Sequence, residues 1–296
     1  MRNSRNGLTT ATFLLCLWLC GSLAFGDDSD ALIDKAMRLS GMTGQIEMVG
    51  KSVLTAIPAD AFPDQKARNE AETFIRRNAS KEAVADLVRS AVREKFNRDN
   101  IEKVIQFYDS ALGRKVGRLQ ENALETGLLK GIREGRKNAI SLDETRLKAI
   151  KRIIDSENVS ETNDILVTSV VRGLLTGSAE AGNAPDDESE SIGSKLKAVQ
   201  KSLAMEQHRM DDMVLTAYAL TFRSLSDKEL EELAAYHDTD AAIWFRDATI
   251  NGLDRAVFSV SKALGAVLTA SRNSGKSDQD SRASSAPGKR KIGRDE

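Results

Sequence analysis

The residues best suited to chemistry in this sequence are its two histidines, because each has carboxylates close by. His208 lies in the segment MEQHRMDD, where a helix would place Asp211 and Asp212 on the same face. His237 lies in YHDTD, directly before Asp238. Helical bundles build metal sites from carboxylates and a histidine three residues away, so a site joining the two segments is one interpretation. However, the chain has no Glu-x-x-His pair. The ordinary alternative is that His237 is a core residue whose imidazole ring packs among apolar side chains.

The patterns of nucleophilic and phosphate-binding sites are missing from the sequence. Both cysteines, Cys16 and Cys20, lie in the apolar N-terminal segment, and no G-x-S-x-G motif is present. Gly275-Lys276-Ser277 resembles the end of a phosphate-binding loop, but alanine stands where the first glycine is required. We therefore predict a protein without catalytic residues, bound metal or cofactor. The alternative is a metal-dependent or carboxylate-based hydrolytic enzyme built in a helical bundle.

The N-terminus has the pattern of a secretory signal. Arg2 and Arg5 precede an apolar run from Ala11 to Phe25, and small residues favour cleavage after Gly26. This run is shorter than the roughly 20 residues of an ordinary membrane span. We therefore predict a signal peptide at 1–26 and a periplasmic or secreted protein without a membrane span after cleavage. An uncleaved anchor is the alternative.

The composition predicts an all-α protein, because proline and aromatic residues are scarce and helix-forming residues are abundant. The formal net charge of −1 gives no indication of a nucleic-acid partner. Asp64 and Ser80 are expected to cap helices, and Ser141 and Ser226 each begin the pattern of a capping box.

The chain also contains an internal repeat, which predicts two tandem homologous helical units packed as one bundle. A segment with apolar residues at helical spacing recurs in degenerate form, pairing Ile101 with Leu230, Val104 with Leu233, Phe107 with Tyr236 and Asp109 with Asp238. Earlier helices pair in the same way, with Ile33 on Ile150, Val49 on Leu166 and Val53 on Val170. We place the first unit at 27–140 and the second at 141–270. An acidic flexible linker at 177–193 interrupts the second unit, and a disordered polar tail follows at 271–296.

The segment FYDSALGRK at 107–115 resembles the core motif of a bacterial secreted family, domain of unknown function twenty fifty-nine. The segment 221–245 looks like a second, more degenerate occurrence. Ala111 stands where that family usually has proline, and the second copy lacks the glycine and the basic pair. The resemblance implies an exported helical protein and supplies no established activity.

The motif has a structural interpretation and a functional one. In the structural interpretation it forms a tight corner between helices, in which Ser110 caps the second helix and Gly113 allows close packing. In the functional interpretation it forms a ligand site built on Tyr108, Arg114 and Lys115. The candidate motif residues are Phe107, Tyr108, Ser110, Gly113, Arg114 and Lys115.

A row of glycines follows the motif on one side of the expected helix. These residues, which fall within an arc of roughly 80° at about 100° per residue, are Gly113, Gly117, Gly127, Gly131 and Gly135. Glycine in a helix interior costs about 0.8 to 1 kcal/mol relative to alanine, so we expect close packing to offset the loss. The partner is either the second unit or another protein, unless the helix frays beyond Leu124.

From these patterns we expect a non-enzymatic binding or scaffolding protein of the cell envelope. Its partner would be an envelope protein that the sequence does not identify, or a second copy of the chain.

Overall fold

The computed structural model describes residues 24–57, 62, 64–125, 143–182 and 188–284, and these ranges contain helices and no strand. The helices in chain order are α2 (Ala24–Leu39), α3 (Met42–Ala56), α4 (Gln65–Asn78), α5 (Lys81–Glu94), α6 (Arg98–Tyr108), α7 (Ala111–Glu125), α9 (Glu144–Glu157), α10 (Val159–Ala181), α11 (Glu188–Thr221), α12 (Asp227–His237) and α13 (Asp240–Ser284). The predicted all-α bundle is therefore confirmed. The interpretation of its halves as two copies of one unit stays a prediction.

Several helices begin at the side-chain caps that the sequence predicts. Asp64 and Ser80 accept hydrogen bonds from the backbone amides of Ala67 and Ala83. Ser226 forms the complete capping box with Glu229 at the start of α12. The capping box predicted at Ser141 is wrong in its register, because the cap of α9 lies two residues later, at Asp143, whose side chain accepts a hydrogen bond from the amide of Arg146.

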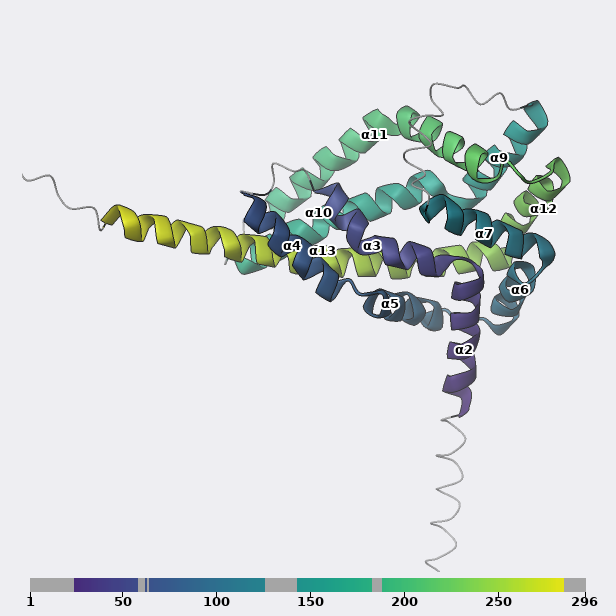
Figure 1. The fold of residues 1–296 in the computed structure, drawn as a ribbon, viewed down its shortest axis with the longest axis horizontal. Coiled ribbons are helices and arrows are strands. Elements are labelled where there is room, and N and C mark those ends of the chain that lie inside the picture. Colours follow the sequence, from purple (N-terminus) through teal and green to yellow (C-terminus); the bar gives the residue numbers. More distant parts are fainter. Residues whose placement is uncertain (1–23, 58–61, 63, 126–142, 183–187, 285–296) are drawn as a thin grey trace, which may run out of the picture.

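Two segments predicted to be unstructured are largely helical. Helix α10 continues to Ala181 and α11 begins at Glu188, so only residues 183–187 of the predicted linker lie outside the described residues. Helix α13 continues to Ser284, well into the predicted polar tail, and Figure 1 shows this end extending beyond the other helices. Extending an existing helix avoids the unfavourable nucleation step, and no proline occurs between Asp240 and Ser284.

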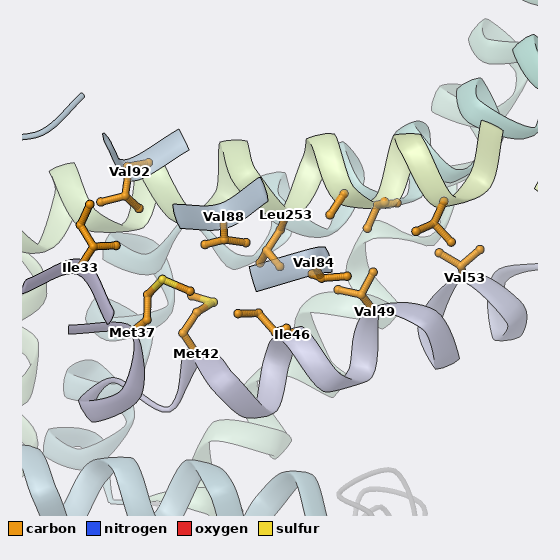
Figure 2. Close-up of a cluster of buried hydrophobic side chains, with 14 of the residues drawn as sticks. Ile33, Met37, Met42, Ile46, Val49, Val53, Val84, Val88, Val92 and Leu253 are labelled. Carbon is orange, nitrogen blue, oxygen red and sulfur yellow. The ribbon is translucent and has the colours of Figure 1, made fainter. Parts of the chain in front are cut away.

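The larger of two hydrophobic cores lies between α2 to α6 and the long helix α13. In Figure 2, apolar side chains of α2 and α3 face a row of valines from α5, with Leu253 of α13 beside them. Val53, Val88 and Val92 are fully buried there. The N-terminal helix is also tied down at its surface, because Arg89 and Arg98 form ion pairs with Asp34 and Asp28.

The smaller core lies among α7, α9, α11 and α12. Its central side chains include Ile150, Ile153, Phe222 and Leu233. Leu112 and Val116 of α7, the last helix that the structure describes in the first half of the chain, belong to this core. Conversely α13, which closes the second half, packs in the core of the first half. The last described helix of each half therefore contributes side chains to the hydrophobic core of the other half.

Glycine does allow close helix packing here, but mainly at positions other than the predicted row. A Cβ atom added at Gly177 of α10 would overlap the carbonyl oxygen of Lys262 in α13. A Cβ atom added at Gly265 of α13 would lie 2.3 Å from the carbonyl oxygen of Leu174 in α10. In the predicted row, Gly113 and Gly117 lie in α7, whereas Gly127, Gly131 and Gly135 lie outside the described residues. Among the described glycines, Gly177 and Gly265 thus mark a close backbone approach of α10 and α13, and Gly113 marks another between α6 and α7.

Candidate functional site

The end of the bundle where α6, α9 and α12 terminate contains a cavity of about 240 Å³. Its lining includes all three tyrosines of the chain, Tyr108, Tyr218 and Tyr236, together with Glu157 and His237. We call this space, whose lining includes these five residues, the tyrosine cavity. A second cavity of about 230 Å³ adjoins it and shares Tyr218 in its wall.

Glu157 is the acidic group of the tyrosine cavity. It is the last residue of α9, and only 19% of its side-chain surface is exposed. The chain turns at once through Asn158, whose φ of 52° lies in the left-handed region that ends α9 before α10 begins. The Tyr218 hydroxyl donates a hydrogen bond to Oε2 of Glu157. This sharp turn therefore holds a carboxylate inside the bundle.

His237 lies opposite, as the last residue of α12, and is 8% exposed. Its Nε2 atom is 3.1 Å from Oε1 of Glu157. The two atoms are close enough to attract each other, but the contact is not aligned as a hydrogen bond, and Nε2 has no other partner among the described residues. The imidazole therefore presents a buried polar atom at the cavity wall.

Aromatic rings from two helices meet beside these groups. The ring of Tyr236 stacks on that of Phe107, with centroids 3.5 Å apart and an interplanar angle of 4°. The ring of Tyr108 meets that of Tyr236 edge to face at 5.6 Å. These are the positions that the predicted repeat aligns, since Phe107 pairs with Tyr236 and Tyr108 with His237. The cavity thus lies where the two aligned segments come together.

The tyrosine hydroxyls stay protonated at this site. Burial raises the pKa of Tyr108, Tyr218 and Tyr236 above the ordinary value for a phenol, and the negative charge of Glu157 raises each of them further. The three phenols are therefore neutral hydrogen-bonding groups over the physiological range of pH.

Arg246 is a basic group at the edge of the same cavity. Its guanidinium donates to the Ser156 carbonyl oxygen and lies 2.7 Å from a carboxylate oxygen of Asp247. Its charge is therefore compensated by a neighbour, and the side chain joins the end of α9 to α13.

Of the motif residues, only Tyr108 lines the cavity. The Ser110 hydroxyl accepts from the amide of Gly113, so it caps α7 as the sequence predicts. A Cβ atom at Gly113 would lie 2.1 Å from the Phe107 carbonyl oxygen, which makes glycine necessary at this corner. Arg114 pairs with Asp109, whereas Lys115 pairs with Glu229 of α12. The structure does not bring Arg114 and Lys115 together with Tyr108.

The two predicted histidine segments also remain apart. His208 is exposed on α11, and the nearby Asp211 accepts from the hydroxyl of Ser160. Asp238 lies outside the cavity and pairs with Arg152. The part of the chain that the structure describes contains no group of three histidine, cysteine or acidic side chains that could hold a metal ion.

Glu157 and Tyr218 were not predicted from the sequence. The one signal for Glu157 was an acidic residue followed by asparagine at the end of a helical pattern, where acidic side chains are unfavourable. The signal for the tyrosines was their scarcity in the chain.

Comparisons with protein-family models, curated proteins and solved structures gave no match to this chain. The resemblance to the secreted family therefore stays a prediction. None of the helices among the described residues is both long and apolar enough to cross a bilayer.

Proposed function

We propose that this protein is exported to the cell envelope and works there by binding a ligand in the tyrosine cavity, without catalysing a reaction. The cavity is the observation that carries the proposal. It gathers every tyrosine of a chain that is poor in aromatic residues, together with one enclosed carboxylate and one enclosed histidine. Pockets that combine apolar walls with a few convergent polar groups are typical ligand sites.

A cavity-filling variant tests this proposal. Thr162 of α10 lines the cavity, whereas Thr55 of α3 is exposed and remote from its lining. Small molecules extracted from the envelope of the producing cell should raise the melting temperature of the wild type and of Thr55→Trp, because a ligand that binds only the folded state stabilises it. Thr162→Trp should give no such rise.

An equal rise in Thr162→Trp would place the binding elsewhere, and no rise in any of the three proteins would contradict a small-molecule role. In that case the remaining form of the proposal is a scaffold that binds another envelope protein or a second copy of the chain. Finding the protein outside the envelope and secreted fractions would contradict export.

A hydrolytic activity is the second candidate, and the contact between Glu157 and His237 favours it. Catalytic hydrogen bonds are often poorly aligned until substrate binds, so a carboxylate oxygen 3.1 Å from an imidazole nitrogen in a cavity can orient that imidazole as a general base once the substrate is in place. Under this candidate Glu157→Gln would abolish turnover of a substrate while leaving its binding in place. Under the binding proposal there is no turnover to lose.

A further inference from the structure

We propose that the tyrosine cavity binds a small organic cation, with an alkylammonium group held between the Glu157 carboxylate and the tyrosine rings. This inference rests on the proposed binding function and names its ligand class.

The first argument is the unbalanced charge of Glu157. Among the described residues no lysine or arginine forms an ion pair with it, and its one basic contact is the misaligned imidazole of His237. An enclosed carboxylate is unfavourable unless it is paired. Its place at the end of α9 adds to the cost, because the C-terminus of a helix carries partial negative charge. A cation in the cavity would remove both penalties.

The second argument is the aromatic wall. Cations are attracted to the faces of aromatic rings, and cages of such rings with a carboxylate are a known way to hold quaternary ammonium groups. Here Tyr108, Tyr218 and Tyr236 all line the space that contains the carboxylate. Because their phenols remain neutral, these tyrosines add no charge of their own to the cavity.

The third argument is that Arg246, the basic side chain at the edge of the cavity, does not pair with Glu157. The guanidinium of Arg246 is held by Asp247 and by the Ser156 carbonyl oxygen. It therefore does not neutralise Glu157, and its own charge is already compensated.

The volume of the cavity and the unpaired Nε2 atom of His237 narrow the choice of ligand further. The volume of about 240 Å³ lies below the range of roughly 300 to 1,000 Å³ for drug-sized ligands, so the cavity suits a molecule of few heavy atoms. Nε2 of His237 is a buried polar atom that lacks an aligned partner in the described structure. A hydroxyl on the ligand would satisfy it.

A pair of probes with the same shape tests the inference on the wild-type protein. Choline carries a quaternary ammonium and a hydroxyl, and 3,3-dimethylbutan-1-ol replaces its charged nitrogen with carbon. Isothermal titration calorimetry should show binding of choline and binding of the neutral alcohol weaker by about tenfold or more. Equal affinities would show an apolar cavity and overturn the cation, while leaving the proposed binding function intact.

If choline fails to bind, n-butylammonium tests a primary amine in the same cavity. Failure of both cations overturns the inference. The proposed function is then judged separately by the cavity-filling variants, since these respond to any ligand.

Variants locate the site. Glu157→Gln keeps the shape of the side chain and should weaken choline binding by about tenfold or more, because it removes the charge. Glu144→Gln makes the same change in an exposed residue of the same helix and should leave the affinity unchanged. Tyr236→Phe should retain most of the affinity, whereas Tyr236→Leu should lose it. Unaltered binding in Glu157→Gln, with a melting curve like that of the wild type, would overturn the proposal.

Discussion

Lys115 and Glu229 form the contact in which a single carboxylate serves two purposes. The Nζ atom of Lys115 lies 2.8 Å from both carboxylate oxygens, and this pair joins α7 to α12. One of those oxygens also accepts from the amide of Ser226 at 2.7 Å, which closes the capping box of α12. The hydrogen bond from Lys115, followed by that from Ser226, lowers the pKa of Glu229 from 4.5 to about 2.

The lowered pKa of Glu229 predicts how the stability of the protein changes with pH. Because the pKa of Glu229 is lower in the folded protein, its stabilisation is complete above about pH 4.5 and is lost as the pH falls toward 2. Glutamine at this position retains the capping box but loses the ion pair. We expect Glu229→Gln to melt at a lower temperature than the wild type at neutral pH, with the difference shrinking between pH 4.5 and 2.

Melting curves followed by circular dichroism measure this effect, and Lys115→Met provides the matched partner. The double variant should lose less than the sum of the two single losses, since both remove one interaction. Additive losses in melting temperature, or a difference between Glu229→Gln and the wild type that does not change with pH, would show that the Lys115–Glu229 pair is not the source of the stabilisation.

At the scale of single residues, local patterns were predictable and the site was not. Ser110 and Ser226 act within one turn of their own helix, so their roles can be derived from neighbouring residues. Glu157 and Tyr218 come from α9 and α11, and only the packing of those helices makes them neighbours. No pattern in one segment could predict that contact.

At the scale of elements, α10 and α13 are packed backbone against backbone. Gly173 and Gly177 of α10 lie one turn apart and face the backbone of α13 near Phe258 and Lys262. Gly265 of α13 meets Leu174 in return. Small residues on both helices therefore set how closely the two approach.

Gly177→Ala should destabilise the protein, although alanine is the better helix former. The new Cβ would overlap the Lys262 carbonyl oxygen, and overpacking of this kind costs about 1 to 3 kcal/mol. Gly193 in α11 provides the control, because a Cβ there would meet nothing within 4 Å. Gly193→Ala should stabilise the protein by about 0.5 to 1 kcal/mol.

Urea unfolding gives the free energy of unfolding of each variant, which should fall for Gly177→Ala and rise for Gly193→Ala. Stabilisation by both substitutions would mean that α10 and α13 separate easily enough to admit a side chain. That result would contradict close packing as the reason for glycine at 177.

The helices themselves could be predicted better than their ends. Apolar spacing predicted the core faces of α5 and α6, where Val84, Val88, Ile101 and Val104 are buried. Composition was misleading at 177–181, at 188–193 and beyond Ala270, because polar residues outside the core can still continue a helix that packing has already nucleated. Where a helix continues past the core in this way, no change in the hydrophobic pattern marks the residue at which it ends.

At the scale of the whole molecule, the two halves of the chain exchange helices, because the last described helix of each half packs in the core of the other. Leu112 and Val116 carry α7 into the core formed by α9, α11 and α12. Helix α13 carries Phe245, Leu253 and other apolar residues into the core formed by the first half. The sequence predicted two units packed together, but an alignment of two segments cannot show which unit each helix completes.

The exchange predicts that neither half folds alone. A fragment of residues 27–140 would lack the α13 residues of its core, including Gly252, which packs against Val88, while residues 141–296 would lack Leu112 and Val116. Each fragment should therefore show little cooperative thermal unfolding by circular dichroism. Mixing them should restore a single cooperative transition, because each supplies the helix that the other needs. A cooperative transition in residues 27–140 alone would mean that its own helices suffice for a core, and the exchange would then be a feature of packing with no part in stability.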